Sequence, residues 1–139
     1  MRSIILYTSK TGAAQECASI LTTEIGDCAI CDLAEITPDL DKYDLVVIGS
    51  GVRASRFYKP VRTFIEKNKD LLQTKKLAFF ICNAAPVTLR EIISKNIPQE
   101  LQEHAVCIKS LGGKPPFKAK ATGWLLNDNL HEFVKALLS

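Results

Sequence analysis

A run of small and hydroxyl-bearing residues near the N-terminus has the composition of an anion-binding loop. Ser9-Lys10-Thr11-Gly12-Ala13-Ala14 follows a short apolar segment and precedes apolar residues at helical spacing. The first N–H groups of a helix have no partner inside the helix, and they lie at the positive end of its dipole. Small side chains let an anion approach this backbone, and the hydroxyls of Ser9 and Thr11 can donate further hydrogen bonds. The loop therefore predicts a phosphate-binding site.

The spacing within this loop excludes two common nucleotide motifs. It lacks the G-x-x-x-x-G-K-S/T pattern of nucleoside-triphosphate loops and the G-x-G-x-x-G pattern of dinucleotide-binding loops. Gly49 and Gly51 follow a later strand and have no third glycine in register. The alternative to a phosphate site is an ordinary polar turn between a strand and a helix.

Alternating strands and helices must position this loop. The predicted strands are Ile4–Tyr7, Ala29–Leu33, Leu45–Ser50, Leu77–Cys82 and Ala105–Leu111. The predicted helices are Ala14–Ile25, a short helix starting at Thr37-Pro38, Pro60–Leu72, Thr88–Ser94, a turn at Pro98–Glu103, and Trp124–Leu138. Such alternation is typical of an α/β fold, a parallel sheet with helices on both faces. The 139 residues suffice for one domain, which we expect to span residues 1–139.

Small residues and hydrogen-bond donors also follow the later strands. Ser50-Gly51-Val52-Arg53 ends the third strand, Asn83-Ala84 follows the fourth, and Gly112 follows the fifth. In an open α/β sheet, ligands bind outside the carboxyl ends of the strands, where these segments would meet. We expect a flat ring to lie among them, although turn chemistry alone also favours Gly and Asn.

Two sequence patterns resemble those of the flavodoxin superfamily. The first loop is similar to the flavodoxin phosphate loop S/T-x-T-G-x-T at its first five positions, and Ala14 replaces the final threonine. Tyr43–Arg53 is similar to the Y-D-x-V-V-I-G-A/S-x-I/V-R segment of the flavodoxin-domain group that includes the menaquinone-type protoporphyrinogen oxidases. The resemblance implies a flavodoxin-like three-layer sandwich, with a five-stranded parallel sheet of order 2-1-3-4-5, and bound FMN.

The resemblance also implies which residues hold the cofactor. The phosphate would lie against the first loop, where Lys10 offers a charge in place of the missing threonine hydroxyl. The full set of expected cofactor-binding residues is Ser9, Lys10, Thr11, Gly12, Ala13, Ala14, Ser50, Gly51, Val52, Arg53, Asn83, Ala84 and Gly112. No catalytic side chain and no metal ligand is assigned.

Net charge, apolar run length and cysteine usage bear on nucleic-acid binding, membrane insertion and cellular compartment. The net charge of +3 comes without a basic stripe interleaved with aromatic residues, so we expect no nucleic-acid partner. No apolar run approaches the roughly 20 residues that span a bilayer. The five cysteines and the absence of a leader pattern predict free thiols in the cytoplasm. Cys28 and Cys31 have C-x-x-C spacing, but they fall in a predicted strand rather than at a helix start.

The leading hypothesis is an FMN-dependent oxidoreductase or electron-transfer domain, with redox chemistry at the flavin. It would exchange electrons with a redox partner protein or with a small molecule such as a quinone. The resembled oxidases carry a longer insertion before the last helix, and flavodoxin carriers are acidic, so the sequence leaves carrier and oxidase as alternatives. The rival hypothesis is a binding or regulatory module without flavin, which the lost hydroxyl at Ala14 favours.

Overall fold

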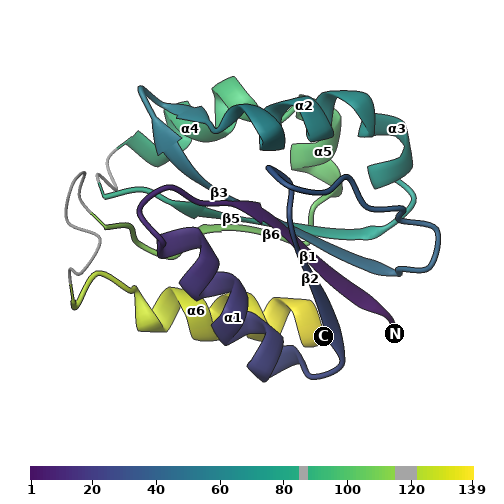
Figure 1. The fold of residues 1–139 in the computed structure, drawn as a ribbon, viewed down its shortest axis with the longest axis horizontal. Coiled ribbons are helices and arrows are strands. Elements are labelled where there is room, and N and C mark those ends of the chain that lie inside the picture. Colours follow the sequence, from purple (N-terminus) through teal and green to yellow (C-terminus); the bar gives the residue numbers. More distant parts are fainter. Residues whose placement is uncertain (85–87, 115–121) are drawn as a thin grey trace.

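A parallel sheet forms the middle of three layers in the computed structural model, which describes residues 1–84, 88–114 and 122–139 (Figure 1). Its strands are β1 (Ser3–Thr8), β2 (Cys28–Asp32), β3 (Leu45–Arg53), β5 (Lys76–Cys82) and β6 (Cys107–Ser110), with the short β4 (Arg56–Phe57) beside β3. The order is β2-β1-β3-β5-β6, and all neighbours on this path are parallel. The predicted α/β class and the 2-1-3-4-5 order are confirmed.

Helices cover both faces of the sheet. The helices α1 (Ala13–Ile25) and α6 (Asn127–Leu138) lie on one side, and α2 (Lys59–Lys67), α3 (Lys69–Leu72), α4 (Leu89–Asn96) and α5 (Gln99–His104) lie on the other (Figure 1). Successive strand side chains point to opposite faces, so each strand feeds two cores. Val47 packs with α1 and α6, whereas Val46 and Ile48 pack with the opposite layer.

The central position of β3 explains its continuous run of apolar residues. Leu45 pairs with Ser3 of β1 on one side and with Lys76 of β5 on the other. Because helices also cover both faces, every residue from Leu45 to Gly51 is buried. The carboxyl end of β3 therefore lies in the middle of the sheet edge that the carboxyl ends of the parallel strands form.

The helix predicted at Thr37-Pro38 is wrong. Residues 36–40 form neither helix nor strand, because aspartate-led turns take the local hydrogen bonds. The Asp32 carboxylate accepts from the N–H of Ala34 at 2.9 Å, and the Asp39 carboxylate accepts from the N–H of Asp41 at 2.9 Å. From the connection between β2 and β3, Leu33 and Leu40 insert into the core.

Two other helix predictions needed correction at their boundaries. The predicted Pro60–Leu72 helix breaks at Asn68, whose side-chain amide donates to the carbonyl of Phe64 at 2.9 Å. The last helix begins at Asn127 rather than Trp124. The N–H of Leu126 donates to the carbonyl of Leu111 at 3.0 Å, which ties the preceding segment to the end of β6.

Candidate functional site

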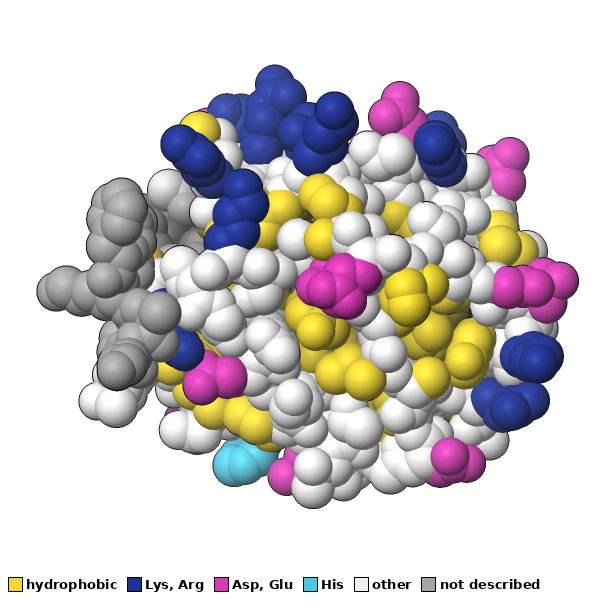
Figure 2. All heavy atoms as spheres, viewed as in Figure 1, with side chains coloured by type: hydrophobic (Ala, Val, Ile, Leu, Met, Phe, Trp, Pro, Cys, Tyr) yellow, Lys and Arg dark blue, Asp and Glu magenta, His cyan; other side chains and the backbone are white. Residues whose placement is uncertain are grey.

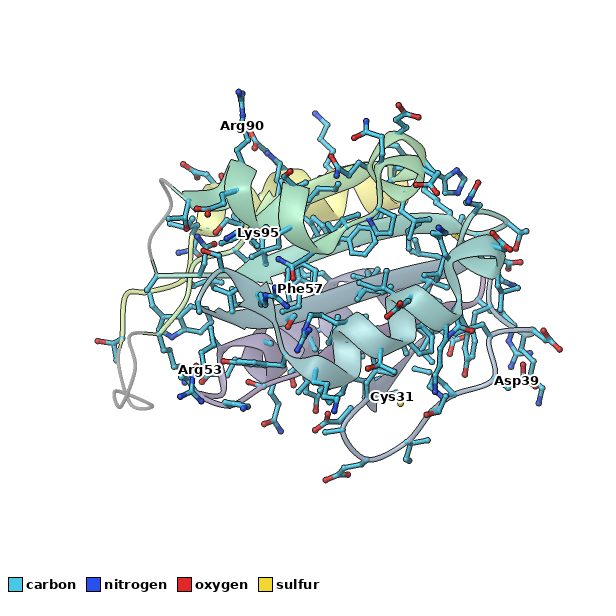
Figure 3. The ribbon with its side chains drawn as sticks, turned by 90° about the horizontal axis from the view of Figure 1, so that it is seen from above. Cys31, Asp39, Arg53, Phe57, Arg90 and Lys95 are labelled. Atoms are coloured by element: carbon cyan, nitrogen blue, oxygen red, sulfur yellow. The ribbon has the colours of Figure 1, made fainter. Side chains whose placement is uncertain are left out.

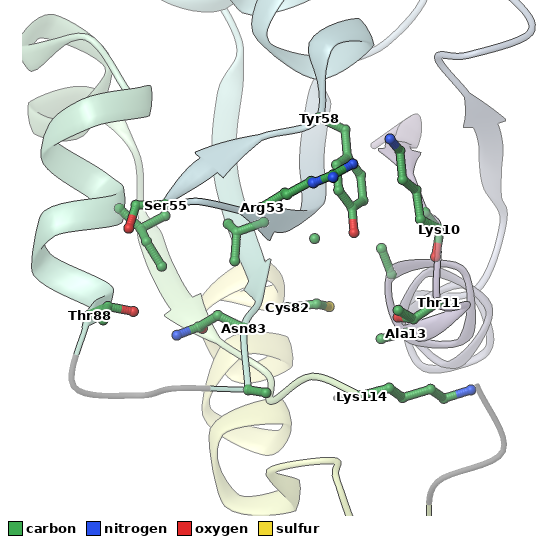
Figure 4. Close-up of a pocket in the computed structure, with 16 residues that line it drawn as sticks. Lys10, Thr11, Ala13, Arg53, Ser55, Tyr58, Cys82, Asn83, Thr88 and Lys114 are labelled. Carbon is green, nitrogen blue, oxygen red and sulfur yellow. The ribbon is translucent and has the colours of Figure 1, made fainter. Parts of the chain in front are cut away.

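A cleft of about 810 Å³ opens at the carboxyl ends of β1, β3 and β5 (Figure 4). Its volume is in the range of small-molecule and cofactor pockets. The lining residues are Ser9, Lys10, Thr11, Ala13, Ala14, Gly51, Val52, Arg53, Ser55, Tyr58, Cys82, Asn83, Ala84, Thr88, Ile92 and Lys114. All predicted site residues except Gly12, Ser50 and Gly112 are in this set.

One end of the cleft is the N-terminus of α1. Gly12 caps the helix with a φ of 95°, and its N–H donates to the hydroxyl oxygen of Ser9 at 3.0 Å. The first i to i−4 bond runs from the N–H of Glu16 to the carbonyl of Gly12 at 2.9 Å. The N–H groups of Ala13 and Ala14 therefore precede the helical ladder and lie at the positive end of the helix dipole. This end suits an anion.

Tyr58 forms an aromatic wall beside the end of β3. A Cβ placed on Gly51 would lie 2.8 Å from the Tyr58 hydroxyl oxygen, so glycine lets this side chain approach the strand. The Lys10 ammonium lies 5.0 Å from the centre of the Tyr58 ring. Burial raises the pKa of Tyr58, with nearby Cys82 acting in the same direction and Arg53 opposing it. The tyrosine is therefore a neutral hydrogen-bonding group at neutral pH.

Ser50 has a structural role instead of a lining one. Its hydroxyl donates to the carbonyl of Gly51 at 2.7 Å and accepts from the N–H of Tyr58 at 3.2 Å. The side chain is buried and bridges β3 to the residue after β4. The Ser50 side chain therefore lies outside the cleft lining and holds Tyr58, while its place beside a ligand stays a prediction.

The ends of β5 and β6 meet through buried polar contacts and close backbone packing. The Ser110 hydroxyl donates to the Asn83 side-chain oxygen at 2.8 Å. A Cβ on Gly113 would lie 2.8 Å from the carbonyl carbon of Asn83, and one on Gly112 would lie 2.0 Å from the Trp124 oxygen. Gly112, with a φ of 87°, therefore shapes the loop without lining the cleft.

A strained hairpin forms the outer wall. Ala54 and Ser55 connect β3 to β4 with φ values of 52° and 64°, a left-handed conformation that hairpin turns usually reserve for Gly and Asn. Asn96 secures this hairpin to the end of α4: it accepts from the N–H of Phe57 at 2.9 Å and donates to the Ser55 carbonyl at 2.8 Å. In the view from above, Phe57 lies beside the part of α4 that carries Lys95 (Figure 3).

We expect Asn96→Ala to destabilise the protein by about 1–3 kcal/mol, because it leaves the N–H of Phe57 and the Ser55 carbonyl without their partner. Chemical denaturation measures this loss. The control is Asn68→Ala, which removes a side-chain bond to the carbonyl of Phe64 at the end of α2 and touches no cleft loop. Equal costs in the two variants would contradict the view that Asn96 holds the hairpin.

Cys82 is a buried thiol at the cleft, held in the protonated form. Cys82 lines the cleft, and its sulfur lies 3.8 Å from that of Cys17. The contact with Cys17 and then burial raise the pKa of Cys82 well above its ordinary value. Burial, helped by Asp27, raises the pKa of Cys28 to about 11. All five cysteines are free, as predicted, and Cys28 and Cys31 lie in β2.

Six lining residues are absent from the predicted cofactor-binding set: Ser55, Tyr58, Cys82, Thr88, Ile92 and Lys114. Cys82 and Tyr58 had a usable signal, because Cys82 ends a predicted strand and Tyr58 follows soon after another. Lys114 has a similar signal, because it follows the predicted strand that ends at Leu111. Ser55 lies in a hairpin, Thr88 precedes α4 and Ile92 lies in α4, and sequence spacing alone does not predict these three positions.

Basic side chains gather on the outer layer near this site. Figure 2 shows Lys and Arg side chains along the edge that carries α2 and α4. A groove of about 380 Å³ on that side is lined by Arg56, Arg62, Lys69 and Lys95, with Glu66 as its carboxylate.

Within the described residues, no group of three or more His, Cys, Asp or Glu side chains could hold a metal ion. None of the described helices is both long and apolar enough to cross a bilayer.

Comparison with known proteins shows similarity to flavodoxins. Residues 4–116 match the family model described as flavodoxin domain. Over 88 residues the chain is 30% identical to a protein of Escherichia coli K12 named protoporphyrinogen IX dehydrogenase (quinone). That match covers 60% of this chain and 49% of the relative, so the chain spans about half the length of the curated relatives it matches.

Solved structures share the fold at low sequence identity. Oxidised flavodoxin 1 from Bacillus cereus has a TM-score of 0.60 and 18% identity, covering 99% of this chain and 97% of that one. A flavoprotein in complex with FMN from Lactobacillus acidophilus has a TM-score of 0.58 and 17% identity, covering 78% of this chain and 92% of that one.

Proposed function

Because this chain belongs to the flavodoxin-domain family, we propose that its cleft binds FMN and that redox chemistry takes place at the bound flavin. The observation that carries the proposal is that two kinds of surface line one cleft. The loop with Ser9 and Thr11 at the start of α1 suits the phosphate, and the part of the cleft beside Tyr58 suits a flat ring.

The described residues fit both ends of FMN. Ser9 and Thr11 offer hydroxyls at the anion end, together with the N–H groups that precede the helical ladder of α1. At the other end, Val52, Ala84 and Tyr58 offer apolar and aromatic surface. FMN supplies one- and two-electron transfer when it is bound, and the protein's part is to bind, orient and tune it.

Arg53 is the residue that we expect to tune the cofactor. It lines the cleft and lies close enough to Tyr58 to oppose the rise in the tyrosine's pKa. A guanidinium is always charged, and a positive charge near the ring favours a more negatively charged reduced form. Asn83 and the backbone at Gly51 and Ala84 complete the set of groups that face the ring.

The test is a comparison of FMN with riboflavin, which lacks the phosphate. We expect FMN to bind at least about 100-fold more tightly, since two charge-assisted hydrogen bonds to phosphate contribute about 3 kcal/mol or more. Thr11→Val should weaken FMN binding about 10-fold or more and leave riboflavin unchanged. Fluorescence titration measures both ligands.

The control for Thr11→Val is Thr37→Val, an exposed threonine outside the cleft, which should leave both affinities unchanged. Equal affinity for FMN and riboflavin would overturn the phosphate assignment. Failure of the wild-type protein to bind either flavin would favour the rival function, a binding or regulatory module without flavin, which the missing hydroxyl at Ala14 supports.

We further infer that the bound flavin exchanges electrons with a partner protein or a quinone-like small molecule in the cytoplasm. The quinone-linked name of the Escherichia coli relative supports the second kind of partner. Stopped-flow reoxidation of the reduced FMN-loaded protein by a soluble quinone tests it. Rapid reoxidation with saturation kinetics is expected for a quinone-linked enzyme, whereas a linear dependence on quinone concentration would favour a carrier.

A further inference from the structure

A buried lysine lies beside the anion end of the cleft and comes from a distant part of the chain. The Lys114 side chain is only 6% exposed, and its ammonium lies 2.7 Å from a carboxylate oxygen of Glu16 in the first turn of α1. The same ammonium is 3.5 Å from the point where a Cβ on Gly12 would stand. Figure 4 shows Lys114 reaching toward Thr11 and Ala13 at that end of the cleft.

The backbone holds this lysine in place. Gly112 packs against the Trp124 carbonyl, and Gly113 packs against the backbone of Asn83 and Ala84, so neither position has room for a side chain. The ammonium also lies 5.6 Å from the centre of the Trp124 ring. Burying an ammonium group carries a large desolvation cost, which such partners offset. The packing of the two glycines, the Trp124 ring and the ion pair with Glu16 therefore help to hold Lys114 in this position.

The ammonium of Lys114, unlike that of Lys10, lies beside the start of α1. Lys10 was expected to supply charge there, but its ammonium lies over the Tyr58 ring and its side chain is exposed. Electrostatic attraction is stronger for a buried charge than for an exposed one, because water screens it less. Glu16 is 52% exposed, so its carboxylate only partly cancels the field of the lysine at the loop.

We propose that Lys114 recognises the ligand's phosphate and that Glu16 competes for the same ammonium group. The ligand class is a phosphate monoester dianion, and the proposal rests on the proposed function in taking FMN as the natural example. Lys114 thus takes the role of the hydroxyl that Ala14 lacks. Because Glu16 holds the ammonium of Lys114 in an ion pair, it lowers the affinity of the protein for the phosphate.

The single tryptophan provides a direct measurement, because the ammonium lies beside its ring. We expect inorganic phosphate, titrated at constant ionic strength, to change the fluorescence of Trp124 with saturation. Lys114→Met should raise the half-saturating phosphate concentration at least 10-fold, and Glu16→Gln should lower it about 3-fold. Lys114→Arg keeps the charge and should retain most of the response.

The matched control is Lys109→Met. Lys109 lies on β6, outside the cleft, and its ammonium forms an ion pair with Glu132 at 2.8 Å, which the substitution breaks. It should leave the phosphate response unchanged. Since Glu16 is half exposed, Glu16→Gln tests the proposal even if Lys114→Met fails to fold. An unchanged phosphate response in Glu16→Gln, or a response in folded Lys114→Met equal to that of wild type, would overturn it.

The FMN-to-riboflavin affinity ratio separates this inference from the proposed function. We expect the ratio to fall about 10-fold in Lys114→Met and to rise about 3-fold in Glu16→Gln. If wild type prefers FMN and neither variant changes the ratio, the role of Lys114 is refuted and the FMN proposal stands. If wild type binds no flavin but phosphate still titrates through Lys114, the FMN proposal fails and the lysine's role stands.

Discussion

We expect Gly49→Ala to lower the free energy of unfolding by about 3 kcal/mol, the upper end of the usual cost of overpacking a core. Gly49 lies in β3 at the centre of the sheet and pairs in register with Phe80 of β5. A Cβ on Gly49 would lie 1.9 Å from the tip of the Phe80 ring, which is fully buried and packs edge-to-face on Phe133. Because the ring is fully buried in a packed core, the added methyl group would force it to shift against its neighbours.

Urea unfolding with a two-state fit measures this change. A double-mutant cycle with Phe80→Leu identifies its cause, because the shorter side chain makes room for the added methyl group. The double variant should therefore be clearly more stable than the sum of the two single changes predicts. Simple additivity would show that the cost of Gly49→Ala has another origin than the Phe80 ring.

We expect Gly12→Val to weaken FMN binding by about 100-fold or more, which corresponds to about 3 kcal/mol. Gly12 caps α1 with a φ of 95°, a conformation that a β-branched residue rarely adopts. The substitution would turn the N–H groups of the first turn away from the phosphate. It would also crowd the ammonium of Lys114, which is 3.5 Å from the position of a Cβ at this residue.

Gly26→Val is the matched control for this substitution. Gly26 caps the other end of the same helix with a φ of 77°, and a Cβ there would have nothing within 4 Å. Both variants should lose stability through backbone strain, but only Gly12→Val should lose FMN affinity. Comparable FMN affinity in the two folded variants would show that the start of α1 does not hold the phosphate.

The α/β class was predictable from the alternation of strands and helices, because apolar strands such as Leu77–Cys82 need cover on both faces and right-handed crossovers provide it. The order of the strands was expected from the resemblance to flavodoxins. The connection after β2 was not predictable in the same way. There, the side chains of Asp32 and Asp39 compete for backbone hydrogen bonds that a helix would otherwise have used.

Two segments of the cleft lining could be predicted from their order along the chain alone. Ser9–Ala14 follows β1 directly, and Gly51–Arg53 ends β3, so chain order alone brings these segments to one edge of the sheet. Their roles follow from local properties: a helix start, small residues and hydroxyl groups. These properties belong to neighbouring residues and can be recognised in a short stretch of sequence.

The distant side chains that complete the cleft are placed by contacts between elements far apart in the sequence. Lys114 reaches α1 from the loop after β6, and Asn96 holds the β3–β4 hairpin from the end of α4. Tyr58 turns toward Gly51 because that position has no side chain and because Ser50 holds its backbone. Contacts of this kind depend on how helices and loops pack across the sheet, and packing joins residues that no spacing in the sequence relates.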